Sequence, residues 1–289
     1  MMSQSDSSPS TYETPNVVDS IPGVSPSTYE TSNVVDASLC SGIEQLQESP
    51  YDFRNDCEFY CVSYNSPERA CQMTERFANM DISLNIHTGV QMNDHRLAYT
   101  NDIQRKRVCS VFYGHIDNLT NFYHTGKKYG FTCEDDVHIH KDLAKRMPTI
   151  IREFEEMKLD ILLLGYMTTA PIKDWWTGYH FKYPYDESRG YQYHAYPSQQ
   201  WGIHLAMFSR DYAKRIMDTF TADYAERAQY DTSLHPPNPD WSLTKLTTER
   251  ALLYPMLAVE DGKGIYDHWG QGEYHRNSHT TNYIEGKFY

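Results

Sequence analysis

Residues 129–140 read Tyr-Gly-Phe-Thr-Cys-Glu-Asp-Asp-Val-His-Ile-His, and they place three consecutive carboxylates directly after a short β-prone run. Adjacent carboxylates repel one another, so this arrangement is unfavourable unless a hard divalent cation or several hydrogen-bond donors absorb the charge. The alternative is a solvated turn or the first turn of a helix, where acidic residues are common. We take a metal site as the working hypothesis.

The spacing of the charged residues supports this hypothesis. In an extended segment, side chains alternate between two faces, so Glu134, Asp136, His138 and His140 would share one face. The pattern therefore predicts that Glu134 and Asp136 bind the same cation.

The first fifty residues differ in composition from the rest of the chain. They contain seven acidic residues and no Lys or Arg, which accounts for more than half of the net charge of −13. The segments 8–19 and 25–36 repeat the same twelve residues with one substitution, Pro15 against Ser32. Burial of so few apolar side chains cannot offset the conformational entropy that the chain would lose on ordering. Residues 1–50 are therefore predicted to be a disordered acidic tail. We favour a passive tail over a partner-binding motif centred on Tyr12 and Tyr29.

Residues 51–289 suit one large domain with a substantial core. The acidic balance and the lack of a basic stripe argue against a nucleic-acid partner. No stretch approaches about 18 apolar residues and no secretory signal is recognisable, which predicts a cytoplasmic protein without a membrane span. The six cysteines lack paired spacing, so buried, reduced thiols are expected rather than zinc ligands or disulfides.

The order of the predicted elements indicates an α/β protein. A strand at 57–64 leads through a turn into a helix that begins at Pro67, and a second strand is expected at 84–90. A helix over 114–128 precedes the acidic segment, and a helix with Pro148 inside it follows. Residues 159–165 form a nearly continuous apolar strand, which is typical of a sheet covered on both faces. Residues 200–207 then predict a strand, followed by a helix over 209–220 that Ser209 caps.

Three later regions carry candidate functional residues. The stretch 175–196 is rich in Trp and Tyr and predicts a long loop, either a wall for sugar rings or bases or an aromatic cluster under a loop. The Pro-rich segment 235–244 places Asp240 beside Trp241 just before an expected helix. The last thirty residues include Asp267, His268 and further histidines, and they predict a flap over a site rather than a helix or strand.

Four segments then stand in a recognisable order. They are FYCVSYNSPERACQMTERF (59–77), GFTCEDDV (130–137), LDILLLG (159–165) and HAYPSQQWGIHLAMFSRDYAKRIMD (194–218). Together they resemble glycosyltransferase family 25, the lipopolysaccharide and collagen-type galactosyltransferases. The resemblance implies a GT-A-like, Rossmann-type mixed sheet flanked by helices in a single domain. The repeat-bearing tail and the Tyr-rich middle differ from compact bacterial members and suit a large DNA virus or a unicellular eukaryote.

The resemblance also implies an inverting hexosyltransferase that uses Mn²⁺ or Mg²⁺. Its donor would be a nucleotide-sugar, in the first place a UDP-sugar, and its acceptor a glycan or glycoprotein hydroxyl. Carried over by position, Glu134 and Asp136 bind the metal, with His268 as a further ligand, and Asp135 is a third ligand or binds the ribose. The resemblance assigns the donor contacts to Ser63, Tyr64 and Arg69. It makes Asp240 the catalytic base.

Two other functions remain open on sequence grounds. One is a non-glycosyl metal-dependent enzyme, a hydrolase or oxygenase, that uses Glu134, Asp136, His138 and His140. The other is a non-catalytic GT-A-like scaffold that binds partners through the acidic tail. Loss of sugar-nucleotide binding on substitution of Asp136 distinguishes a transferase from the scaffold.

Overall fold

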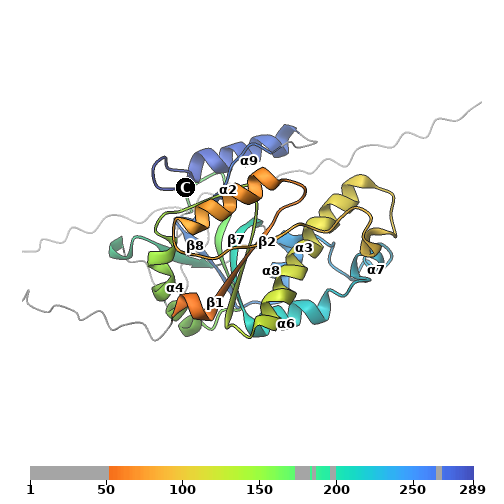
Figure 1. The fold of residues 1–289 in the computed structure, drawn as a ribbon, viewed down its shortest axis with the longest axis horizontal. Coiled ribbons are helices and arrows are strands. Elements are labelled where there is room, and N and C mark those ends of the chain that lie inside the picture. The colour runs from red at the N-terminus through yellow and green to blue at the C-terminus, as the bar shows by residue number, and fades with distance from the viewer. Residues whose placement is uncertain (1–51, 173–182, 184–186, 196–199, 265–268) are drawn as a thin grey trace, which may run out of the picture. The chain divides into compact units, whose positions relative to one another are not determined.

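The computed structural model describes residues 52–172, 183, 187–195, 200–264 and 269–289 (Figure 1). The expected tail at 1–50 and most of the aromatic stretch lie outside these residues. The elements in chain order are α1 (Phe53–Asp56), β1 (Cys57–Val62), α2 (Pro67–Ala78), β2 (Asn85–His87), η1 (His95–Leu97), α3 (Ile103–Thr125), β3 (Tyr129–Glu134), β4 (Val137–Ile139), α4 (Leu143–Met157), β5 (Ile161–Met167), η2 (Glu187–Arg189), β6 (Gln192–Ala195), β7 (Trp201–Ser209), α6 (Arg210–Thr219), α7 (Tyr224–Arg227), α8 (Pro239–Lys245), β8 (Arg250–Tyr254), β9 (Ala258–Glu260) and α9 (Trp269–Asn282).

The main sheet has seven strands in the order β2-β1-β3-β7-β5-β8-β6. β1 pairs in parallel with both β2 and β3, and β5 pairs in parallel with β8. β7 runs antiparallel between β3 and β5, and β6 runs antiparallel at the edge beside β8. The carboxyl ends of β1, β3 and β5 therefore meet the start of β7 at one edge of the sheet. A second, two-stranded sheet pairs β4 with β9.

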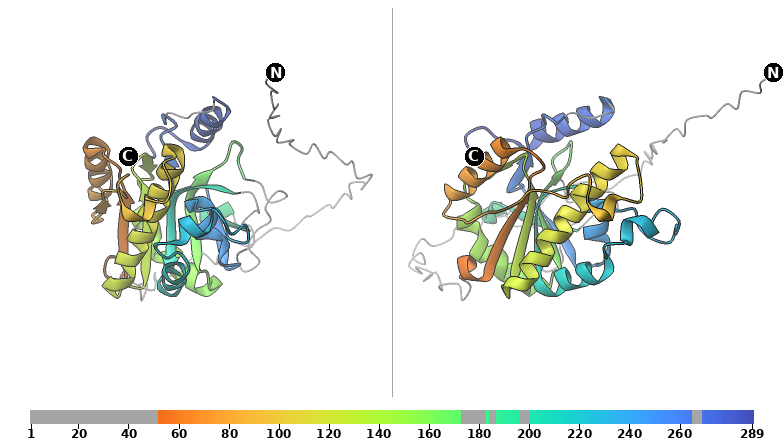
Figure 2. Two further views of the ribbon diagram at one scale, coloured as in Figure 1. Left: turned by 90° about the vertical axis from the view of Figure 1, so that its right-hand side faces the viewer. Right: turned by 45° about the vertical axis from the view of Figure 1, so that its right-hand side comes forward.

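Helices cover both faces of the main sheet, and β5 shows why its sequence is apolar throughout. Leu162 and Leu164 belong to a core shared with α2 and α4, whereas Ile161 and Leu163 belong to a core shared with α3 and α6. Every side chain of such a strand meets a packed layer, so none has a solvated face. The views in Figure 2 show the same layering of helices against the sheet. The predicted α/β class, with a mixed sheet flanked by helices, is confirmed.

Local signals explain most helix boundaries. Pro67 occupies the first turn of α2, and the Ser209 hydroxyl accepts a hydrogen bond from the Tyr212 N–H at the start of α6, as expected. α4 runs through Pro148 without a break. The predicted start of α3 at residue 114 is wrong, since the helix begins at Ile103. The carboxylate of Asp102 caps it by accepting hydrogen bonds from the backbone N–H groups of Gln104 and Arg105.

The described part of the aromatic stretch is also more ordered than predicted. It contains η2 and the edge strand β6 rather than loop alone. The hydroxyls of Tyr191 and Tyr193 donate to the buried Glu153 carboxylate at 2.9 and 2.7 Å, and Arg189 pairs with the same carboxylate. These tyrosines therefore anchor β6 to α4, which supports the interpretation of an aromatic cluster for this part of the stretch.

The C-terminal region departs most from expectation, because α9 is a helix of fourteen residues. Its sequence has a weak helical pattern, but tertiary hydrogen bonds hold it in place. The Thr168 N–H donates to the Ser278 hydroxyl at 3.1 Å, and the Asn282 amide donates to the Thr168 carbonyl at 2.8 Å. The prediction of a region that is neither helix nor strand is wrong for these residues.

The cysteine prediction is confirmed in part. Cys57, Cys61, Cys109 and Cys133 are buried free thiols, whereas Cys71 is a free thiol on the surface. Burial raises the pKa of Cys57 far above its usual range, which keeps this thiol protonated and unreactive.

Candidate functional site

The acidic segment lies at the edge where the parallel strands end. β3 ends at Glu134, a two-residue turn carries Asp135 and Asp136, and β4 begins at Val137. The segment is therefore not one extended strand, and the predicted alternation of faces is wrong beyond Glu134. The turn nonetheless places the Asp135 carboxylate beside Ser63, because β1 and β3 pair in register up to Val62 and Glu134.

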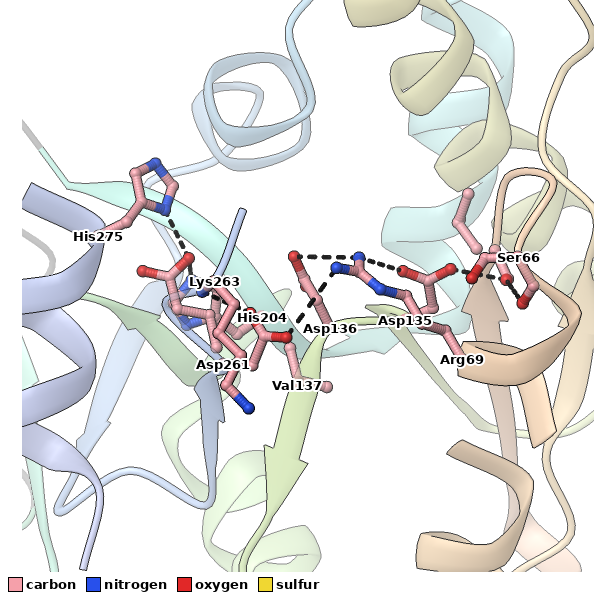
Figure 3. A network of polar contacts seen from close by, with 12 residues as sticks. Ser66, Arg69, Asp135, Asp136, Val137, His204, Asp261, Lys263 and His275 are labelled. Atoms are coloured by element: carbon pink, nitrogen blue, oxygen red, sulfur yellow. Dashed lines mark hydrogen bonds and ion pairs between the residues drawn. The ribbon is translucent and has the colours of Figure 1, made fainter. Parts of the chain in front are cut away.

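Ser63 and Arg69 both bind Asp135. The Ser63 hydroxyl donates to Asp135 Oδ2 at 2.6 Å, and Arg69 Nη1 donates to Asp135 Oδ1 at 3.3 Å. Arg69 also reaches Asp136 Oδ2 and Asp261 Oδ2, each at 4.0 Å, so one guanidinium serves three carboxylates (Figure 3). Asp135 thus has both oxygens engaged. This arrangement fits Asp135 as a support for the site better than as a direct cation ligand.

Tyr64, the third predicted donor contact, packs against Gly89. A Cβ at Gly89, whose φ is +71°, would approach the Tyr64 ring carbon Cδ2 to 3.1 Å. The backbone of residue 89 therefore lies directly on the tyrosine. Tyr64 follows Ser63 just after the carboxyl end of β1.

Negative charge accumulates around Asp136. Burial, followed by the charges of Glu134 and Asp261, raises the pKa of Asp136 well above its usual range. Asp261 follows β9, and its N–H donates to the Asp136 carbonyl at 2.7 Å, which joins the two acidic turns. A bound cation would relieve this repulsion, since ions of opposite charge are the strongest local influence on such a group.

His115 lies behind Glu134 in the interior. Its Nε2 atom is 3.7 Å from Glu134 Oε1, and the imidazole is fully buried. Burial alone would raise the pKa of Glu134, but the imidazole of His115 holds that pKa below its usual range. His115 therefore favours the charged form of the carboxylate that the sequence predicts to bind metal.

The tautomer of His115 follows from its other ring nitrogen. Nδ1 lies 2.9 Å from the Thr132 hydroxyl, which also accepts a hydrogen bond from the Asn118 amide at 3.1 Å. Since the amide can only donate, the hydroxyl hydrogen is available to Nδ1, and this arrangement favours Nδ1 as an acceptor. The ring proton is consequently on Nε2, where it faces Glu134, and the charge of that carboxylate favours the same tautomer.

Asp240 is in the first turn of α8, where the Asn238 side chain caps the helix. Burial, and then the charge of Glu134, raises the pKa of Asp240 to about 6, while a hydrogen bond from the Gly202 N–H opposes this. Gly202 lies at the start of β7 with a φ of +82°, a conformation that favours glycine. The fold thus brings the predicted base within electrostatic range of Glu134.

Sequence reasoning missed Glu260 and His204. Glu260 ends β9, is 3% exposed, and has an oxygen 2.5 Å from His275 Nδ1 and 3.8 Å from His204 Nε2. Figure 3 shows His275 and His204 on this side of the acidic edge. A signal was available, because Glu260 and Asp261 follow an apolar strand just as the triplet at 134–136 does.

The predicted metal ligand His268 lies outside the described residues. Within the described ranges, no group of three or more His, Cys, Asp or Glu side chains is arranged to hold a metal ion. Two carboxylates suffice for Mg²⁺ and for similarly hard ions in phosphate-binding sites, because water and substrate oxygens complete the coordination. Glu134 and Asp136 supply hard oxygen donors of this kind, so the residues present fit such an ion.

No protein-family model matches the chain, and no curated protein matches it. The chain has a remote similarity to solved structures, two of which follow. A197 from STIV is 14% identical, with a TM-score of 0.38 over 68% of this chain and 80% of that one. A glycosyltransferase involved in the glycosylation of the major capsid of PBCV-1 is 8% identical, with a TM-score of 0.34 over 75% of this chain and 98% of that one. Similarity this remote carries no argument about function, so the resemblance to family 25 rests on the sequence segments.

In the part of the chain that the structure describes, every helix is too short or too polar to span a bilayer.

Proposed function

We propose that the protein is a metal-dependent glycosyltransferase that moves a sugar from a nucleotide-sugar, in the first place a UDP-sugar, to a hydroxyl of a glycan or glycoprotein. The observation that carries the proposal is the meeting of two carboxylate types at one edge of the sheet. Glu134, held charged by His115, lies within electrostatic range of Asp240, whose pKa is raised to about 6. A charged ligand and a carboxylate titrating near neutral pH are what an inverting transfer requires.

In the proposed reaction, Glu134 and Asp136 would hold Mn²⁺ or Mg²⁺. The bound ion would neutralise charge on the departing nucleoside diphosphate, as a Lewis acid does in other phosphate-leaving reactions. Ser63 and Arg69 orient the acidic turn through Asp135, and Tyr64, which follows Ser63 in the chain, would contact the donor. Asp240 accepts the proton of the acceptor hydroxyl. In the same step, the oxygen of that hydroxyl bonds to the sugar and the bond from the sugar to the diphosphate breaks.

The alternative enzyme built on His138 and His140 has less support. His138 Nδ1 lies 3.0 Å from the Tyr289 carbonyl, and His140 Nδ1 accepts a hydrogen bond from the Asp142 N–H at 3.1 Å. Burial lowers the pKa of both imidazoles. Their contacts are with the C-terminal segment and with the start of α4, and not with the acidic turn.

Calorimetric titration of UDP- and GDP-sugars, first with Mn²⁺ and then with EDTA, tests the proposal. We expect one donor to bind only with metal, and Asp136→Asn to abolish that binding. Asp211→Asn, an exposed carboxylate on α6, is the matched control and should bind as the wild type does. Absence of metal-dependent binding by every donor would favour the non-catalytic scaffold.

A further inference from the structure

A cavity of about 660 Å³ lies between the N-terminal half of α3 and the segment that follows α7. Figure 2 shows these two parts of the chain near each other at the side of the molecule. The volume is in the range of sites for small organic ligands, roughly 300–1,000 Å³. None of its lining residues belongs to the acidic edge, so the proposed transfer leaves this cavity without a role.

The walls of the cavity are largely apolar. Val108 and Leu234 line it, and Pro236 and Pro237 extend the same surface. Val108 is 44% exposed, and Ile103 and Tyr230, which neighbour lining residues in the sequence, are 63% and 80% exposed. An exposed apolar side chain such as Val108 within an apolar lining is typical of a binding site for an apolar group.

Two polar side chains of the lining, Arg105 and Gln229, bind each other. Arg105 Nη1 donates to Gln229 Oε1 at 2.9 Å, which fixes the Gln229 amide in place. The Tyr99 hydroxyl lies 3.1 Å from Cys109 Sγ, so these two polar groups satisfy each other.

The charge of the lining favours a ligand with a negatively charged group. Among the described residues that line the cavity, Arg105 is the only charged one, and no carboxylate accompanies it. The chain as a whole carries a net charge of −13, so a cationic site without a nearby acid in its lining stands out from its surroundings. A negatively charged oxygen would accept hydrogen bonds from Arg105.

We propose that this cavity binds a small amphipathic carboxylate. Its apolar body packs on Val108 and the two prolines, and its carboxylate accepts hydrogen bonds from Arg105. The ligand is distinct from the nucleotide-sugar and from the acceptor, and its binding requires neither metal nor transferase activity.

The test is calorimetric titration of the full chain with decanoate and with decanol, both below their aggregation limits and in EDTA. The two probes share an apolar body and differ in the head group. We expect decanoate to bind saturably, at least about tenfold more tightly than decanol, because hydrogen bonds to charged groups contribute that much. Equal affinity for both probes, or no saturable binding of either, would overturn the proposal.

Two variants locate the site. Arg105→Met removes the charge while keeping a long side chain on the helix, and it should weaken decanoate binding about tenfold without changing the affinity for decanol. Arg107→Met is the matched control, since Arg107 is exposed on the same helix but does not line the cavity. Gln229→Met removes the oxygen that holds Arg105 Nη1, so it should also weaken decanoate binding. Wild-type affinity for decanoate in both Arg105→Met and Gln229→Met would show that the carboxylate binds elsewhere and would refute the assignment.

Discussion

At the scale of single residues, the site depends on groups whose protonation the interior controls. His115, Thr132 and Asn118 are each fully buried, and their hydrogen bonds favour the tautomer that directs a proton toward Glu134. Burial and the charge of Glu134 disfavour the ionised form of Asp240. This suits a catalytic base but destabilises the folded protein. Each of these two features leads to a prediction.

The first prediction concerns the tautomer of His115. Side-chain ¹⁵N NMR of the metal-free protein should show the His115 proton on Nε2. Thr132→Val, which removes the hydroxyl but keeps the shape, should lose this preference and weaken Mn²⁺ binding, whereas Thr132→Ser should retain both. A proton on Nδ1 in the wild type would contradict the hydrogen-bond assignment, whether or not the protein transfers sugars.

The second prediction is that Asp240→Asn stabilises the fold while abolishing activity. The pKa of Asp240 is higher in the folded state, about 6, than its ordinary value of 3.8, so ionisation above pH 6 destabilises the folded protein. A shift of this size corresponds to at most about 3 kcal/mol, so we expect a gain of about 1–3 kcal/mol at pH 7. The gain should shrink as the pH falls from 6 to 4.

Denaturant unfolding of metal-free protein at pH 4, 5, 6 and 7 measures the effect of Asp240→Asn. Asp211→Asn serves as the control, because an exposed substitution should change stability by less than about 0.5 kcal/mol. If the free energies of unfolding of Asp240→Asn and the wild type differ by a constant amount across this pH range, ionisation of Asp240 is ruled out as the cause of the difference.

At the scale of elements, the site requires the small sheet to lie close to the main one. Gly165 of β5 provides that approach, since a Cβ there would lie 2.4 Å from the Ala258 carbonyl oxygen and 2.8 Å from the Ala258 Cβ. β9 begins at Ala258 and ends at Glu260, so this contact positions Glu260 and the adjacent Asp261. The same region also supports α9, because His279 Nδ1 lies 2.7 Å from the Glu260 carbonyl.

Gly165→Ala should therefore move β9 and destabilise the protein by about 1–3 kcal/mol, the usual result of overpacking. Thermal unfolding measures this loss, and Mn²⁺ binding should weaken with it. Gly126→Ala is an informative comparison, because φ is +80° there but no heavy atom lies within 4 Å of a Cβ. It should cost about 1–2 kcal/mol from backbone strain and leave Mn²⁺ binding unchanged. Unchanged stability in Gly165→Ala would contradict the close approach.

At the scale of the whole molecule, charge repulsion at the acidic edge couples folding to metal binding. Asp136 is raised in pKa by burial and by its neighbours, so its ionised form opposes folding at neutral pH. A ligand that binds only the folded state stabilises it by about 2.7 kcal/mol at one hundred times its dissociation constant. The proposed cation should therefore appear in the stability of the protein.

We expect Mn²⁺ to raise the unfolding temperature of the wild type by several degrees, given roughly 2–4 °C per kcal/mol for a chain of this size. Asp136→Asn should be more stable than the wild type in EDTA and should gain little from Mn²⁺. The control Asp211→Asn should respond to the metal as the wild type does. A wild-type unfolding temperature that Mn²⁺ leaves unchanged would argue against the metal site.

The sequence by itself determined the elements with a strong local signal. The apolar run of β5, the Pro67 start of α2 and the Ser209 cap of α6 predict their own structures, because periodicity, fixed φ and capping act within a few residues. The acidic triplet was also recognisable as a site, since its repulsion is visible in the sequence itself.

Only the tertiary structure decided which distant groups surround that triplet. His115, His204 and Glu260 come from a helix and two strands far apart in the chain, and no local pattern links them. α9 likewise depends on contacts with Thr168 and Glu260, because its own sequence offers little amphipathic pattern. Sequence periodicity reports which face of an element is buried, whereas the partners it meets depend on how the strands are ordered in the sheet. That order follows from packing of the whole core.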